Sequence, residues 1–163
     1  MGICGLQWVE VGGTLSPVAN REQSNLEKQK PQNKNNYMAA IDSFERRLDD
    51  KNRLTIPAEL RAELDEGQIV LTRGFGRYIH MYAADVWDEE VEPALQGAIL
   101  DERVADLNVR FRRGKSTAQL DIKQGRVTID QSLLEYAGID REIIAVRAGK
   151  YWRMMSPAEA ETS

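Results

Sequence analysis

An aspartate and an arginine four residues apart form the strongest candidate site in this sequence. The segment reads Asp49, Asp50, Lys51, Asn52 and Arg53. Asp and Asn favour tight turns, and residues 54–56 (Leu-Thr-Ile) are strand formers. The arginine therefore stands where a turn enters a strand, and Asp49 is placed to hold either the loop or the arginine. A guanidinium fixed in this way can make bidentate contacts with a guanine edge or a phosphate.

The same pair also has a purely structural interpretation, in which Asp49 and Arg53 form an ion pair that only stabilises the loop. Neighbouring cations favour a wider basic face instead. Arg46 and Arg47 precede the turn, and Arg61 follows it. For Arg61 an ordinary position on a helix surface is an equal alternative.

An internal repeat places a related segment 73 residues later in the chain. Residues 53–56 (Arg-Leu-Thr-Ile) align with residues 126–129 (Arg-Val-Thr-Ile). The second copy adds Lys123 and Arg126 to the candidate site. Each copy predicts the same order of elements: a short strand, a turn, a second strand, a short helix and two strands around a glycine turn.

The local patterns give these elements approximate bounds. A weak alternating strand is expected at 44–48 and a helix at 58–64, with Pro57 in its first turn. Two hairpins are expected, the first from 69–72 and 78–82, the second from 143–146 and 151–155. Gly138 is expected to end the helix of the second copy.

Residues 85–111, between the copies, have a helical pattern with Asp85 as its cap. Two apolar stripes support it: Trp87, Val91 and Leu95 recur every fourth residue, and Val104, Leu107 and Phe111 follow the i, i+3, i+7 spacing. We expect both stripes to pack into a core or a helical hairpin. Trp87 and Trp152 are likewise expected to be packing residues.

The total charge of −4 hides an uneven distribution. Residues 78–106 carry a net charge of −7, whereas residues 107–126 carry +5. A basic face is therefore compatible with an acidic chain, because electrostatic function depends on local fields. The sequence does not reveal where the four cations at the end of the linker point, and they can simply solubilise it: Arg110, Arg112, Arg113 and Lys115.

Several classes of protein are excluded by composition. A single cysteine, Cys4, and a single histidine, His80, exclude a disulfide scaffold, a cysteine metal cluster and a two-histidine metal site. His80 is expected to be structural or on the surface. No phosphate loop or nucleophile elbow is present, so we expect no enzyme, no cofactor, no metal and no small-molecule substrate.

The ends of the sequence give a further expectation. No apolar run is long enough to span a membrane and no secretory signal is visible, which predicts a cytosolic protein. Residues 1–36 are polar and unpatterned, which predicts disorder. One hypothesis is that Met38 is the true start, and the intact mass of the native protein would test it.

Residues 48–61 resemble the first SpoVT-AbrB half of the MraZ family. Asp49 and Arg53 match the family's pattern of an Asp, three residues and an Arg before a Thr-Ile-Pro strand end. Asn52 stands where glycine is usual, and asparagine is the next-best residue for a left-handed turn position. Residues 120–129 resemble the second half, although Ile122 adds one residue and Asp130 replaces a common proline.

The resemblance, which runs from about residue 40 to 161, implies an α+β fold. In this family two tandem AbrB-like halves, each a swapped hairpin, interlock as a pseudo-two-fold small β-barrel joined by a helical linker. The implied organisation is a disordered tail or non-native extension at 1–37, SpoVT-AbrB halves at 43–86 and 115–158, and the linker at 87–114.

The resemblance also implies a function. Members resemble sequence-specific transcriptional regulators that bind short direct repeats in the promoter of the division and cell-wall gene cluster. The partners would be double-stranded DNA and further copies of the chain in a ring, in the cytoplasm at the nucleoid and without a membrane. The DNA-binding set would be Arg46, Arg47, Asp49, Lys51, Asn52, Arg53, Arg61, Lys123 and Arg126.

Two alternatives stay open. Another AbrB-type regulator, such as an autorepressing antitoxin, usually has one copy and a toxin-binding tail, whereas this chain has two copies and little after Pro157. A ring-forming interaction protein without DNA binding is the other alternative, and Asn52 and the Ile122 insertion keep it open.

Overall fold

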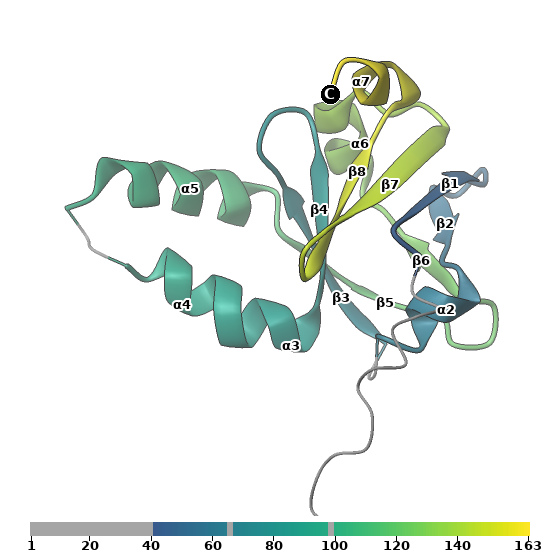
Figure 1. The fold of residues 1–163 in the computed structure, drawn as a ribbon, viewed down its shortest axis with the longest axis horizontal. Helices are drawn as coiled ribbons and strands as arrows, with labels where there is room; N and C mark the ends of the chain where they lie inside the picture. The colour runs from purple at the N-terminus through teal and green to yellow at the C-terminus, as the bar shows by residue number, and fades with distance from the viewer. Residues whose placement is uncertain (1–40, 65–66, 98–99) are drawn as a thin grey trace, which may run out of the picture. The chain divides into compact units, whose positions relative to one another are not determined.

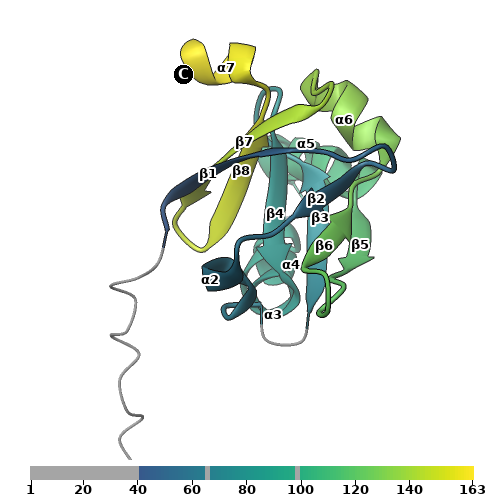
Figure 2. The same cartoon turned by 90° about the vertical axis from the view of Figure 1, so that its right-hand side faces the viewer.

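The computed structural model describes residues 41–64, 67–97 and 100–163. The expected tail and the alternative start at Met38 lie outside these residues. The described part has a mixed α+β fold, as predicted, with a six-stranded sheet and a separate two-stranded sheet (Figures 1 and 2).

The strands and helices follow the predicted order. The strands are β1 (Ser43–Arg47), β2 (Arg53–Thr55), β3 (Gln68–Arg73), β4 (Ile79–Ala83), β5 (Ser116–Gln119), β6 (Arg126–Thr128), β7 (Glu142–Ala148) and β8 (Tyr151–Met155). The helices are α2 (Ala58–Arg61), α3 (Ala84–Val86), the π-helical turn η4 (Trp87–Val91), α4 (Glu92–Leu95), α5 (Glu102–Arg113), α6 (Gln131–Ala137) and α7 (Pro157–Glu161). Both hairpins form, and α6 ends at Gly138, as predicted.

Strands of the two sequence repeats interleave in both sheets. The large sheet has the order β1-β7-β8-β4-β3-β5, and all its neighbours are antiparallel. Thus β1 of the first copy pairs with β7 of the second, and the two hairpins meet where β4 pairs with β8. The small sheet pairs β2 of the first copy with β6 of the second.

The large sheet is open within the described residues, so the expected closed barrel is not seen there. Its two edges are β1 and β5. The turn after β1 carries the chain out of the sheet, and β2 then pairs with β6 alone. Because these two strands join neither edge of the large sheet, they do not close it.

The linker, predicted to be helical over 85–111, forms two helical runs. A first helical run comprises α3, η4 and α4, and a second run, α5, begins at Glu102. The prediction of Asp85 as a cap is wrong, because the first run begins after Ala83 and Asp85 lies inside its first turn. Asp101 caps α5 instead, with its carboxylate accepting a hydrogen bond from the N–H of Arg103 at 3.0 Å.

The break lets the two apolar stripes face each other. Asn108 donates from α5 to the carbonyl of Leu95, the last residue of α4. Trp87, Leu95 and Phe111 are buried in a small second core, against which Val91 and Leu107 pack. The main core lies between the sheets and contains Trp152, so both tryptophans are packing residues as predicted.

Within the described residues, no helix has the length and apolar character needed to cross a lipid bilayer.

The main core gives a stability prediction. Leu71 in β3 is fully buried, so Leu71→Ala should lower the free energy of unfolding by about 2–5 kcal/mol. Leu100 is 97% exposed, so Leu100→Ala should change it by less than about 0.5 kcal/mol. Urea denaturation of both variants measures the difference, and equal losses would contradict the packing described here.

Candidate functional site

The carboxylate of Asp49 clasps the turn between β1 and β2. Its Oδ1 accepts hydrogen bonds from the backbone N–H of Lys51 at 2.8 Å and of Arg53 at 3.0 Å. Its Oδ2 accepts a bond from Nε of Arg53 at 2.6 Å. The Asp49 and Arg53 side chains are still 33% and 35% exposed. The clasp therefore holds the guanidinium through Nε while the side chain stays partly exposed.

The clasp holds Asp49 in its charged form. Partial burial opposes ionisation, but the two backbone hydrogen bonds, the bond from the Arg53 side chain and the charge of Arg53 outweigh it. Together they lower the pKa of Asp49 to about 2. The ion pair therefore persists at every pH at which the protein is expected to work.

Asn52 turns the chain inside this clasp. Its φ of 56° is positive, as the sequence predicted for the position where glycine is usual. Its Nδ2 donates to Oε1 of Gln131 at 2.9 Å, and its carbonyl accepts from the N–H of Ile129 at 2.9 Å. Asn52 thus joins the first loop to the start of α6 and to the end of β6.

The second loop does not repeat the clasp. Oδ1 of Asp121 accepts from the backbone N–H of Lys123 at 3.0 Å and of Gln124 at 3.2 Å. With Ile122 inserted, Arg126 lies five residues after Asp121 and pairs with it only through the backbone. The Arg126 side chain instead approaches the first loop, with Nη1 3.9 Å from Oδ2 of Asp49.

Pairing of β2 with β6 brings the two arginines to one surface. Arg53 lies opposite Thr128, Leu54 opposite Val127, and Thr55 opposite Arg126. Leu54 and Val127 are buried. Because side chains alternate along a strand, Arg53 and Arg126 both project from the opposite face of this ribbon. The repeat assigned Arg53 and Arg126 to one candidate site, but the register that brings them together could not be predicted, since no local signal reports the pairing of distant strands.

Arg61 of α2 also reaches the second loop. Its Nε donates to the carbonyl of Ile56 at 2.8 Å. The guanidinium lies directly against Gly125, where a Cβ would overlap it. Gly125 has a φ of 65° and its carbonyl accepts from the N–H of Ile56 at 2.8 Å. The structure therefore places Arg61 beside the loop that carries Arg126.

The remaining predicted cations differ in their placement. Lys51 and Lys123 are exposed in the two turns and make no ion pair within the described segments. Arg46 and Arg47 are successive residues of β1, so they project to opposite sides of the strand. The expectation that both extend one basic face is therefore wrong, and at most one of them can do so.

Two of the four linker cations have local partners. Arg112 pairs with Glu92, and Nζ of Lys115 lies 4.7 Å from the centre of the Trp87 ring. Arg110 and Arg113 instead line a pocket with Arg73, on the other side of α5. The sequence could not separate these roles, because all four residues follow one another within six positions.

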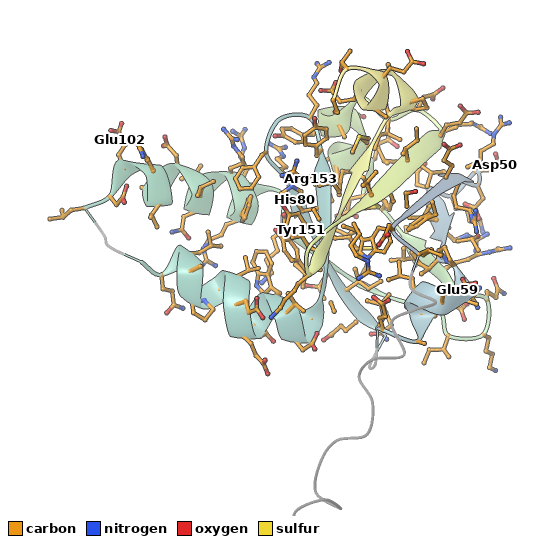
Figure 3. The ribbon with its side chains drawn as sticks, viewed as in Figure 1. Asp50, Glu59, His80, Glu102, Tyr151 and Arg153 are labelled. Carbon is orange, nitrogen blue, oxygen red and sulfur yellow. The ribbon has the colours of Figure 1, made fainter. Side chains whose placement is uncertain are left out.

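His80 is structural rather than on the surface. It lies in the centre of the fold near Tyr151 and Arg153 (Figure 3). Its Nδ1 is 3.0 Å from the hydroxyl of Tyr82. Burial, with the nearby positive charge of Arg153, lowers the pKa of His80 to about 4, so the ring is neutral at pH 7. In the part of the chain that the structure covers, no group of acidic, histidine or cysteine side chains is placed to hold a metal.

Comparison with known proteins identifies similar chains. Residues 40–102 match a family model described as "MraZ protein, putative antitoxin-like". A protein of Kocuria rhizophila named Transcriptional regulator MraZ is 40% identical over 109 residues, covering 67% of this chain and 75% of its own. A protein of the same name from Roseiflexus castenholzii is 32% identical, covering 72% of this chain and 80% of its own. Another from Treponema denticola is 31% identical, covering 68% of this chain and 77% of its own.

Asn52 gives a prediction about the first loop. Asn52→Ala should lower the free energy of unfolding by about 1–2 kcal/mol, because alanine resists a positive φ and lacks the bond to Gln131. Asn52→Gly loses that bond but accepts the backbone angle, so its loss should be smaller. Urea denaturation compares the two, and a larger loss for glycine would contradict the left-handed turn.

Asp49 gives a prediction about pH. Because its pKa of about 2 lies below the ordinary value of 3.8, the clasp stabilises the fold fully above about pH 4 and progressively less as the pH falls towards 2. Asp49→Asn should therefore be less stable than the natural protein at pH 6, and the difference should shrink at pH 2.5. Asp50→Asn, at an 89% exposed side chain, is the control. A difference independent of pH would contradict the charged clasp.

Proposed function

Because the chain belongs to the MraZ family, we propose that it is a sequence-specific DNA-binding transcriptional regulator. The observation that carries the proposal is the convergence of Arg53 and Arg126 on one exposed face of the β2–β6 ribbon. Asp49 holds Arg53 through Nε alone, so its terminal nitrogens are available for a guanine edge or a phosphate.

The surrounding residues complete the proposed interface. Asp49 and Asn52 position the first loop and the arginine behind it. The cations around them would contact DNA: Lys51, Arg53, Arg61, Lys123 and Arg126, together with one of Arg46 and Arg47. The strand register allows Arg46 or Arg47, but not both, to share the face of the loops. So few cations in one chain predict weak binding per copy and a steep dependence on salt, because each phosphate contact releases counterions.

Assembly would supply the missing affinity. We propose a ring of identical chains that engages several short direct repeats in the promoter of the division and cell-wall gene cluster, so that linked binding events reinforce one another. Among the described residues, β1 and β5 are the edges of the large sheet, and they support assembly, since an edge strand can pair with a neighbour. The proposed place of action is the nucleoid in the cytoplasm, and no catalytic role is proposed.

The interleaved strands support two SpoVT-AbrB halves at 43–86 and 115–158. Each half supplies a strand that pairs with the other, in β1–β7 and β2–β6. The halves would therefore fold together as a pseudo-two-fold unit with the linker at 87–114 projecting from it. The swapped-hairpin arrangement is part of this proposal.

The experiment measures binding to DNA from upstream of the protein's own gene, beside a scrambled sequence, near physiological salt. The natural protein should prefer its own sequence. Arg53→Ala should weaken that binding by about 1–3 kcal/mol, which is about 5- to 150-fold, if Arg53 reads a base. Arg53→Lys keeps the charge but not the fork, so it should recover affinity without recovering preference.

Arg103→Ala is the matched control, because Arg103 is exposed on α5 and its N–H bond to Asp101 is made by the backbone. It should bind like the natural protein. Light scattering must show that Arg53→Ala keeps the assembly of the natural protein. If the natural protein assembles but shows no preference for its own DNA, a ring-forming interaction protein, with Asp49 and Arg53 as a structural pair, replaces this proposal.

A further inference from the structure

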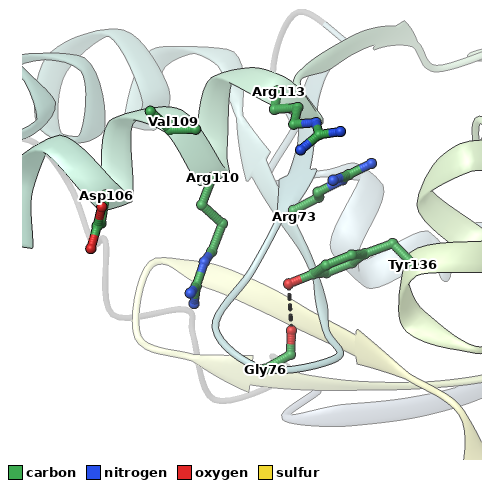
Figure 4. Close-up of a pocket in the computed structure, with 7 residues that line it drawn as sticks. All are labelled: Arg73, Gly76, Asp106, Val109, Arg110, Arg113 and Tyr136. Carbon is green, nitrogen blue, oxygen red and sulfur yellow. Dashed lines mark hydrogen bonds between the residues drawn. The ribbon is translucent and has the colours of Figure 1, made fainter.

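A basic pocket lies between α5, the β3–β4 turn and α6, apart from the β2–β6 ribbon (Figure 4). Its volume is about 440 Å³, which is in the size range of small-ligand sites. The residues that line it are Arg73, Gly76, Asp106, Val109, Arg110, Arg113 and Tyr136. Three guanidinium groups thus share one concave site with a single carboxylate.

Helix α5 supplies one wall of the pocket. Asp106, Val109, Arg110 and Arg113 follow the i, i+3, i+4, i+7 spacing, so they lie on one face of the helix. Leu107 and Phe111 pack on the other side, in the small core. Because that packing fixes the rotation of α5, Arg110 and Arg113 project from the face of the helix that lines the pocket.

Arg73 enters from the end of β3. Its Cζ lies 4.9 Å from the centre of the Tyr136 ring, and its stem passes directly under Gly114, where a Cβ would overlap it. Tyr136 is itself fixed, since its hydroxyl donates to the carbonyls of Gly74 at 3.2 Å and Gly76 at 2.6 Å. Nε of Arg73 is buried and has no hydrogen-bond partner in the described part of the chain.

The three arginines lack the partners that neutralise other cations of this protein. Arg112 and Arg147 have carboxylates within 2.8 Å, whereas none of the pocket arginines makes an ion pair among residues 41–64, 67–97 and 100–163. Like charges held together in a concavity favour a multivalent anion. The fork of arginine matches the geometry of phosphate.

We propose that this pocket binds a phosphate group, with Arg73, Arg110 and Arg113 as its ligands. Asp106, which also lines the pocket, reduces its net positive charge. The phosphate can be free, as in a small diphosphate, or belong to a DNA backbone, and the experiment distinguishes these two sources.

A second explanation for α5 is purely structural. Cations in the last turn of a helix stabilise its dipole, and Arg110, Arg112 and Arg113 all lie there. That role needs no ligand and predicts that removal of Arg110 and Arg113 lowers thermal stability equally with and without phosphate. It does not account for Arg73, which belongs to β3 and lines the same pocket.

The test titrates the full chain with inorganic pyrophosphate in low-chloride buffer by calorimetry. The natural protein should bind saturably with one site per chain. The double variant R110Q/R113Q should bind at least about tenfold more weakly, because two charged hydrogen-bonding groups are lost. The matched control R77Q/R103Q removes two exposed arginines that do not line the pocket and should bind like the natural protein.

Three results would overturn the proposal: no saturable binding by the natural protein, equal weakening in both double variants, or a changed molar mass of R110Q/R113Q with unchanged pyrophosphate binding. The last would assign the arginines to contacts between copies.

The salt dependence of DNA binding then identifies the source of the phosphate. The quantity compared is the slope of the logarithm of the DNA-binding constant against the logarithm of the salt concentration. If R110Q/R113Q reduces the magnitude of this slope by about one or two, the phosphate belongs to the DNA backbone. If the slope is unchanged, the pocket binds a free phosphate compound.

Discussion

The short antiparallel pairing of β2 with β6 is the contact on which the candidate interface depends. Each strand has three residues, and a two-stranded ribbon of this size is not stable alone. Its inner face supplies the missing stability, because Leu54 and Val127 are buried in the main core. The outer face can therefore hold two arginines from distant parts of the chain. The loops become one surface only when the core has formed.

This arrangement explains why an acidic residue, Asp49, lies between two arginines. Arg53 and Arg126 would repel each other across the ribbon, and Oδ2 of Asp49 lies within 4 Å of a nitrogen of each. The same carboxylate also accepts hydrogen bonds from backbone N–H groups of the turn. One side chain therefore closes the loop and offsets the repulsion between the two arginines. The second loop has no equivalent, because Asp121 is bound to the backbone N–H groups of Lys123 and Gln124. Two similar sequence repeats thus build an asymmetric site.

What the sequence predicted correctly is local. The turn at Asn52, both hairpins and the end of α6 are determined by residues within a few positions of each other. Short sequence patterns are therefore enough to predict them. What local patterns left open concerns long-range contacts. The helical region 85–111 forms two runs, because its two apolar stripes are buried by packing against each other, with Asn108 bonded to Leu95. The meeting of Arg126 with Asp49 and the separate roles of the linker arginines depend on register and helix rotation, which no single segment encodes.

Helix α6 connects the two basic regions of the molecule. Gln131 at its start bonds to Asn52 in the first loop, and Tyr136 near its end bonds to the β3–β4 turn and stacks beneath Arg73. Five residues of helix separate these contacts by about 7.5 Å along the axis. A displacement of the whole helix would therefore move Tyr136 and Gln131 together. Any effect of the pocket on the loop would then be reciprocal, because coupling between two binding sites has the same free energy in both directions.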